Sequence, residues 1–308
     1  MDTQITSHTE QVLSSLQQFW GIVLVANSGQ DEYTSSCPRC GDGGKGPDSD
    51  RFHVWTSYPP RWWCRKCNWK GRIETLHLPN VDTEEFKRAR AALLAERLAQ
   101  QITARDKMAS CTDHIGYYHQ LLKDPTKIAL WTEDGVTMET IHQHKLGHCS
   151  FCPTDKAHRE SLTIPVFANG TLLNIRHRLL GIETNKYRPH RKHLGQALFN
   201  SDALKEYPRG MLVEGEKKTL VVLQYSLPSV GVSGSTSFLE EWAPLFDTWD
   251  RVYVCFDPDA IDQAEETARC IGPKALVMDC PYKVDDFLLA GATRNDLLRM
   301  MKLARRVS

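Results

Sequence analysis

Apolar residues are spaced differently in successive parts of the chain, and each spacing predicts a different element. Between His8 and Trp20 they recur every three or four positions, which is typical of an amphipathic helix. Residues 51–55 alternate with a period of two, as a strand does. Residues 82–108 are rich in Glu, Lys, Arg, Ala and Leu and contain no Pro or Gly, so we expect a solvated helix that links two domains.

The period of two returns in the middle of the chain. Residues 114–148 have a mixed pattern that favours helices, but the runs 162–168 and 171–179 alternate and flank Asn169-Gly170. Because this dipeptide favours the positive φ angles of a type I′ turn, the two runs predict a β-hairpin.

Beyond residue 210, short apolar runs alternate with helix-like sequence. The runs are 211–213, 228–232, 251–256 and 274–278. This alternation predicts a mostly parallel sheet covered by helices. The chain is therefore expected to be a multidomain protein of mixed α+β and α/β class.

Carboxylates follow two of these apolar runs directly. Glu214 ends the first run, and Asp257 and Asp259 follow the third. Since the carboxyl ends of parallel strands meet at one sheet edge, where ligands bind, we expect the three side chains to gather there. Hard oxygen ligands favour Mg²⁺ or Mn²⁺. A pair of solvated turns is the alternative, because Gly and Asp-Pro are common in loops.

Two cysteine pairs have the spacing of zinc knuckles. Cys37 and Cys40 form the first pair, and Cys64 and Cys67 form the second after 23 intervening residues. Four thiolates can close a tetrahedron around one structural Zn²⁺. The alternative is four unrelated buried cysteines. Ten cysteines in a chain of this length, which we expect to lie in a reducing compartment, favour metal ligands over a disulfide framework.

A third pair, Cys149 and Cys152, lies just after three histidines, but no further pair follows it. A second metal half-site is one interpretation. We favour ordinary buried or loop residues.

Basic and aromatic residues alternate between the two knuckles. Arg51, His53 and Trp55 share one face of the predicted strand. Such a surface suits single-stranded nucleic acid, because bases stack on rings and cations meet phosphates. Alternatively the tryptophans form the core of a small domain, and we expect at least one to do so. The other residues of this group are Arg61, Trp62, Trp63, Arg65, Lys66 and Lys70.

A second basic segment follows the predicted hairpin turn. Alternation places Arg176 and Arg178 on one strand face, and Lys186 lies downstream. Residues 172–194 contain six Lys+Arg and a single acidic residue. The pattern fits a groove that follows a phosphate backbone, and a solvated sheet face is the alternative.

Composition adds limits to the class of protein. The 308 residues are 25% charged and 41% apolar, and the net charge is zero. Residues 1–205 carry 26 Lys+Arg and 22 Asp+Glu, whereas residues 206–308 carry 12 and 16, which suits a polyanion-binding part joined to a metal-binding part. We expect a cytoplasmic protein with no membrane partner, because no apolar run approaches about 18 residues and the start lacks a signal peptide.

In chain order these features resemble the bacterial and phage replicative primases of the DnaG-like type, whose catalytic domain has the TOPRIM fold. The resemblance covers roughly residues 30–300 and depends on the motifs in combination. The motif residues are Cys37, Cys40, Cys64, Cys67, Arg176, Arg178, Lys186-Tyr187, Leu198-Phe199-Asn200, Val213-Glu214-Gly215, the loop 231–237, Asp257-Pro258-Asp259 and the segment 283–287.

The resemblance implies template-directed synthesis of short RNA primers from ribonucleoside triphosphates on single-stranded DNA. Glu214, Asp257 and Asp259 would hold catalytic Mg²⁺ or Mn²⁺, and Asp286 with Asp285 would help to place a second ion. The zinc module would help to choose the start site. The residues implied to bind template or nucleotide are Arg176, Arg178 and Lys186, together with Arg61, Trp63 and Lys66 of the zinc module.

The same resemblance implies four parts of the chain. Residues 1–80 form a zinc-ribbon DNA-binding domain, 81–110 a helical linker, 111–205 a basic α+β subdomain and 206–308 the TOPRIM domain. No Gly-x4-Gly-Lys-Ser/Thr phosphate loop is found, so a replicative helicase is expected to act in trans.

Lys218 stands where many TOPRIM primases have an acidic residue, and Glu216 is a candidate to compensate for it. This difference keeps two rival functions open. One is a zinc-dependent single-strand-binding accessory protein with an inactive TOPRIM fold. The other is a TOPRIM nuclease.

Overall fold

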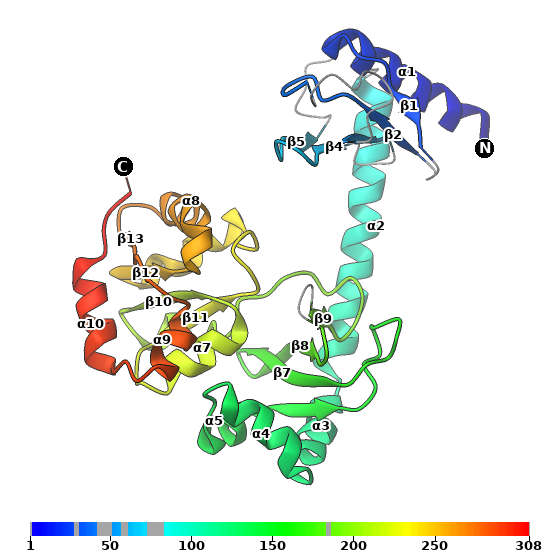
Figure 1. Cartoon of the computed structure of the whole chain (residues 1–308). Coiled ribbons are helices and arrows are strands. Elements are labelled where there is room, and N and C mark those ends of the chain that lie inside the picture. The colour runs from blue at the N-terminus through cyan, green and yellow to red at the C-terminus, as the bar shows by residue number, and fades with distance from the viewer. Residues whose placement is uncertain are drawn as a thin grey trace. The chain divides into compact units, whose positions relative to one another are not determined.

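The structure is a computed structural model that describes residues 2–27, 31–41, 51–56, 61–72, 83–182 and 186–307. The chain divides into two compact units, Met1–Leu98 and Ala99–Ser308, each with its own core. Helix α2 (Thr83–Ala109) contributes residues to both units. Figure 1 shows the elements of each unit.

The first unit packs one helix against a small antiparallel sheet. Helix α1 begins at Asp2 and ends at Trp20, so it starts earlier than the predicted helix. The apolar side chains of Val12 and Leu16 are fully buried against Phe52 and Val54. The sheet has the order β1-β2-β3-β4-β5. Its strands are β1 (Val25–Ala26), β2 (Glu32–Ser35), β3 (Phe52–Trp55), β4 (Arg61–Cys64) and β5 (Lys70–Arg72).

Helices α4 and α5 of the second unit begin at residues whose side chains cap them. In α4 the Asp124 carboxylate accepts a hydrogen bond of 3.0 Å from the Thr126 N–H, and Pro125 occupies the first helical position. In α5 the Thr137 hydroxyl accepts from the Thr140 N–H at 3.3 Å. The three helices after α2 are α3 (Asp113–Leu122), α4 (Pro125–Glu133) and α5 (Met138–His144).

The predicted hairpin is confirmed and lies in a four-stranded antiparallel sheet. Asn169 and Gly170 have φ angles of 49° and 72°, as a type I′ turn requires. The sheet order is β6-β7-β8-β9, so two short strands that the alternation did not predict cover its edges. The strands are β6 (Gly147–Cys149), β7 (Ser161–Ala168), β8 (Thr171–Leu179) and β9 (Tyr187–Pro189).

The parallel sheet predicted for the C-terminal part is also confirmed. Its order is β11-β10-β12-β13, and all three pairings are parallel. The chain runs from β10 outward to β11 and then returns across β10 to β12. The elements are α6 (Ala203–Glu206), β10 (Arg209–Glu214), α7 (Glu216–Leu223), β11 (Ser229–Val232), the 3-10 segments Glu240–Thr248 and Pro258–Ala260, β12 (Arg251–Cys255), α8 (Ile261–Ile271), β13 (Ala275–Val277), α9 (Val284–Leu289) and α10 (Arg294–Leu303).

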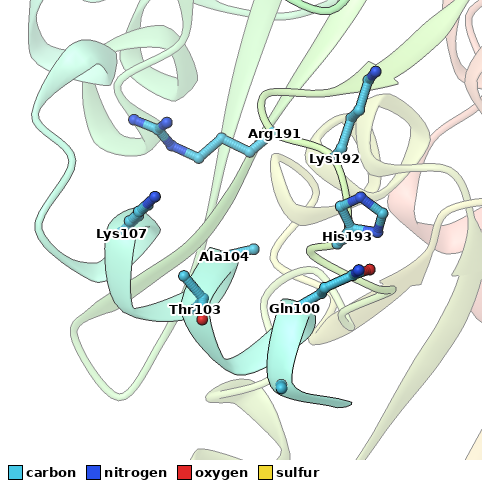
Figure 2. Close-up of a pocket in the computed structure, with 8 residues that line it drawn as sticks. Gln100, Thr103, Ala104, Lys107, Arg191, Lys192 and His193 are labelled. Carbon is cyan, nitrogen blue, oxygen red and sulfur yellow. The ribbon is translucent and has the colours of Figure 1, made fainter. Parts of the chain in front are cut away.

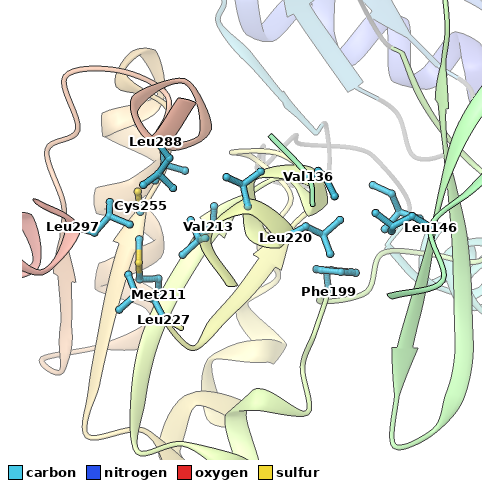
Figure 3. Close-up of a cluster of buried hydrophobic side chains, with 14 of the residues drawn as sticks. Val136, Leu146, Phe199, Met211, Val213, Leu220, Leu227, Cys255, Leu288 and Leu297 are labelled. Atoms are coloured by element: carbon cyan, nitrogen blue, oxygen red, sulfur yellow. The ribbon is translucent and has the colours of Figure 1, made fainter. Parts of the chain in front are cut away.

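Both faces of the parallel sheet are buried, because alternate side chains of each strand enter different cores. Met211 and Val213 of β10 pack with Leu220 of α7 and with helices α9 and α10 (Figure 3). The intervening Leu212 packs on the other side with Val254 of β12 and with α8. The core that contains Met211 and Val213 also includes Val136 and Leu146, so it joins the segment of helices α3–α5 to the parallel sheet (Figure 3).

The expected mixed α/β architecture is therefore confirmed. Among the residues with described structure, no helix combines the length and apolar character needed to cross a membrane.

Candidate active site and metal centre

The reversal of strand order places Glu214 and Asp257 side by side. Glu214 is the last residue of β10, and Asp257 follows the adjacent strand β12. The Asp257 N–H donates a hydrogen bond of 3.2 Å to Glu214 Oε2. Ligands of open α/β sheets bind at such a reversal, beyond the carboxyl ends of the two strands. The position of these two acidic residues is therefore that of a ligand site.

Gly215 separates two glutamates that have different surroundings. Its φ of 94° is a conformation that residues with a side chain rarely adopt, and it turns the chain from β10 into α7. Glu216 is 2% exposed, and its Oε1 lies 3.0 Å from Arg176 Nε of β8. The Arg176 guanidinium also lies 5.7 Å from the centre of the Tyr187 ring. Glu216 is thus paired with Arg176 of strand β8.

The Lys218 ammonium contacts Asp257, one of the two acidic residues that meet at the strand reversal. Lys218 Nζ donates to Asp257 Oδ1, and Lys283 Nζ lies 3.7 Å from the other oxygen, Oδ2. Lys218 and Asp257 are 15% and 13% exposed, so this pair is largely screened from water. The carboxylates are hard donors that suit Mg²⁺ or Mn²⁺. The Lys218 ammonium would compete with such an ion for the oxygens of Asp257.

The remaining predicted acidic residues are placed differently from one another. Asp259 and Asp286 are exposed. Asp285 is 3% exposed, and its Oδ2 lies 2.9 Å from Lys217 Nζ. Within the described parts of the chain, Glu214, Asp257 and Asp259 are not among the groups whose possible ligand atoms all lie within 4.8 Å of one another.

A carboxylate that the sequence did not single out connects strand β8 to helix α7. Asp134, just after α4, accepts from Arg178 Nη1 with one oxygen and lies 3.3 Å from Lys217 Nζ with the other. Burial acts to raise the pKa of Asp134, but the Arg178 hydrogen bond and the Lys217 charge hold it below its ordinary value. Asp134 follows a helix and no motif, so no local signal marked it.

Lys186 adds positive charge to the same region. Burial lowers the pKa of its ammonium, and the nearby charges of Arg178 and Lys217 lower it further. Of the three residues predicted for the basic segment, Arg176 and Arg178 lie on β8, and Lys186 directly precedes β9. Arg176 and Arg178 are each bound to a carboxylate.

The four cysteines of the two knuckles converge in the first unit. Their sulfurs all lie within 4.8 Å of one another, with 3.8 Å between Cys37 and Cys67 and 3.8 Å between Cys40 and Cys64. Zn–S bonds of about 2.3 Å at tetrahedral angles place two sulfurs about 3.8 Å apart. The cluster thus fits one Zn²⁺ ion with four sulfur ligands, as predicted.

One face of the small sheet presents aromatic and basic side chains. Trp63 pairs with His53 across β3 and β4, and Arg61 pairs with Trp55. The Arg61 guanidinium lies 4.9 Å from the Trp55 ring centre, and Trp63 is 37% exposed. Lys66 is exposed in the following turn. Trp62 is 4% exposed and packs in the core, so the expectation that at least one tryptophan is internal is confirmed.

A basic pocket of about 430 Å³ lies in the second unit between α2 and the segment after β9 (Figure 2). Its positive side chains come from both walls, which suits a phosphate-bearing ligand. The lining residues are Ala99, Gln100, Thr103, Ala104 and Lys107 of α2, with Arg191, Lys192 and His193 opposite.

Cys149 and Cys152 are both buried, at 3% and 0% exposure. Neither belongs to a group of possible metal ligands within the described residues. Their surroundings agree with the interpretation as ordinary buried residues.

Comparison with known proteins gives relatives by structure alone. No protein-family model matches the chain, and no curated protein sequence matches it. The zinc-binding and RNA polymerase domains of the Aquifex aeolicus primase are 16% identical, with a TM-score of 0.53 over 99% of this chain and 86% of that one. The E. coli primase catalytic core is 16% identical, with a TM-score of 0.55 over 66% of this chain and 81% of that one.

A third structure, the DnaG primase catalytic domain bound to single-stranded DNA, is 18% identical, with a TM-score of 0.51 over 69% of this chain and 84% of that one. At these identities the likeness shows the fold. The chain has the fold of the zinc-binding and catalytic domains of DnaG-like primases, and the resemblance drawn from the sequence is confirmed at that level.

Proposed function

We propose that this protein is a DnaG-like primase that synthesises short RNA primers on single-stranded DNA. The observation that carries the proposal is the contact between Glu214 and Asp257 at the strand reversal of a primase-like sheet. The same chain holds a four-cysteine cluster in the unit that resembles a primase zinc-binding domain. In this proposal residues 206–308 form a TOPRIM domain, after a zinc ribbon (1–80), a linker (81–110) and a basic subdomain (111–205).

Glu214, Asp257 and Asp259 would hold Mg²⁺ or Mn²⁺, with Asp286 and Asp285 as candidates for a second ion. The ion would lower the pKa of the attacking 3′-hydroxyl and offset the charge of the incoming triphosphate. The nucleophile and the leaving group both belong to substrate, so the protein's own task is to position two ribonucleotides.

The basic residues would hold the polyanions. Arg178, Lys186 and Lys217 form a group of positive charges around Asp134, and they would offset the charge of a triphosphate. Arg176 is bound to Glu216 and stacks near Tyr187, so its contribution to the template groove would include holding β9 in place. In the zinc module, Trp63, Arg61 and Lys66 would contact bases and phosphates of the template and help to select the start site.

Replacing Asp257 tests the proposal. Asp257→Asn should abolish primer synthesis in a labelled-ribonucleotide assay with single-stranded DNA and Mg²⁺ or Mn²⁺, while DNA affinity stays within about twofold. Asp247→Asn is the matched control, because Asp247 also pairs with a lysine, Lys274, and is 76% exposed. Full synthesis by Asp257→Asn would contradict the assignment.

A second function is favoured by the contact between Lys218 and Asp257. An ammonium that occupies the carboxylate would suit a zinc-dependent single-strand-binding accessory protein with an inactive catalytic fold. The same assay separates the candidates, because new oligomers indicate a primase, cleaved DNA a nuclease, and binding without products an accessory protein. A replicative helicase is the further partner that we propose.

A further inference from the structure

A second group of possible metal ligands lies in the larger unit, far along the chain from the knuckle cysteines. Cys111 and Asp113 flank Thr112 at the junction of α2 and α3, and His190 follows β9. One possible ligand atom from each of the three residues lies within 4.8 Å of the other two. His190 Nε2 is 3.0 Å from Asp113 Oδ2 and 3.9 Å from Cys111 Sγ.

These separations suit a tetrahedral zinc ion. Zn–N bonds of 2.0–2.1 Å with Zn–O and Zn–S bonds of about 2.1 and 2.3 Å place the nitrogen about 3.4 Å from the oxygen and about 3.6 Å from the sulfur. The two observed separations from His190 Nε2 differ from these values by about 0.4 and about 0.3 Å. A thiolate and an imidazole select zinc-like ions over Mg²⁺ or Ca²⁺.

Buried hydrogen bonds behind His190 orient its ring. His190 is 5% exposed, and its Nδ1 lies 3.0 Å from Nε2 of His177, which is fully buried. His177 Nδ1 in turn lies 2.9 Å from the hydroxyl of the buried Ser161. When each ring donates from Nδ1, the His190 Nε2 that faces Cys111 and Asp113 carries no proton. Metal-binding histidines are held in this way by a partner on the other ring nitrogen.

We propose that Cys111, Asp113 and His190 bind one zinc ion, which is separate from the four-cysteine site. Asp113 is 50% exposed, so water can supply a fourth ligand. The ion would join the end of α2 to the segment that begins at His190. Lys107 and Arg191 lie close to these ligands in sequence and line opposite walls of the basic pocket (Figure 2). The bound ion would therefore fix the two walls of the pocket relative to each other. Zinc binding at this site does not require that the protein synthesises primers.

An ion pair between His190 and Asp113 is the competing explanation, because a carboxylate is also favourable in the first turn of α3. The two explanations differ in the number of zinc ions that the full-length protein binds. Zinc per chain is measured by plasma mass spectrometry after equilibration with excess Zn²⁺ and dialysis.

The expected result is two zinc ions in the wild type and one in Cys111→Ser. Asp113→Asn should also hold one, and because this side chain is half exposed it serves if Cys111→Ser does not fold. Cys270→Ser is the matched control and should keep two, since Cys270 is half-buried and belongs to neither group. With ¹¹³Cd in place of zinc, a second NMR resonance should appear upfield of the four-sulfur resonance and vanish in Asp113→Asn. One zinc ion in the wild type, or two in Asp113→Asn, would overturn the proposal.

Discussion

At the scale of single residues, the contact between Lys218 and Asp257 determines how readily the candidate active site accepts a metal ion. Lys218→Ala removes the ammonium from Asp257 Oδ1. We expect the variant to bind Mn²⁺ at least about tenfold more tightly, which corresponds to about 1.4 kcal/mol of binding free energy. This change is small for the removal of a largely buried charge that competes with the ion. Titration followed by the electron paramagnetic resonance of free Mn²⁺ measures the change. Lys274→Ala removes a lysine from a pair at the surface and should have no effect. Equal affinities in wild type and Lys218→Ala would contradict the competition.

Asp134 tests how much a single connecting carboxylate stabilises the larger unit. Asp134→Asn leaves Arg178 and Lys217, which are 18% and 15% exposed, without their common anionic partner. We expect the free energy of unfolding in urea to fall by about 1–3 kcal/mol at pH 7. Because the pKa of Asp134 is lowered on folding, its stabilising effect is present above the ordinary value of 3.8 and is lost as the pH falls further.

The difference between wild type and Asp134→Asn should therefore shrink below about pH 4. Asp247→Asn, at an exposed pair, should change stability by less than about 0.5 kcal/mol at either pH. If the difference in free energy of unfolding between wild type and Asp134→Asn stays constant from pH 7 to pH 3, this role of the ionised carboxylate is excluded.

At the scale of elements, the β7–β8 hairpin depends on backbone conformation at its turn. Gly170→Ala should destabilise the protein by about 1 kcal/mol, because φ is 72° there although the added methyl group meets no atom within 4 Å. Gly116→Ala, inside α3 and equally free of contacts, should stabilise it by about 0.5–1 kcal/mol. Urea unfolding of both variants gives the two signs. A loss of stability in Gly116→Ala as well would contradict the assignment of the Gly170→Ala effect to φ.

At the scale of the whole molecule, the two units should respond differently to loss of the four-cysteine site. The first unit has a small core around Val12, Phe52 and Trp62, so a structural zinc ion would supply much of its stability. Cys64→Ser should abolish hydrogen-exchange protection in β2–β4 and leave protection in β10–β12 unchanged. Cys270→Ser should alter neither region. Loss of protection throughout the chain in Cys64→Ser would show that the units do not fold independently.

Local patterns in the sequence were sufficient for most of the elements. The Asn169-Gly170 hairpin, the two knuckles and the β-α alternation were all predicted, because turn conformation, thiolate spacing and periodicity depend on residues close together in the chain. The short edge strands β6 and β9 were not, since three residues are too few to show a period.

The tertiary structure alone decided which residues meet. The sequence predicted carboxylates at one sheet edge, but only the order β11-β10-β12-β13 brings Glu214 beside Asp257. The tertiary structure also pairs Lys218 with Asp257, and it brings His190 to Cys111 although 79 positions separate them in the sequence. Such contacts depend on strand order and on packing between distant segments. Charge and apolar spacing along the chain fix which face a side chain occupies, and they do not fix its neighbour.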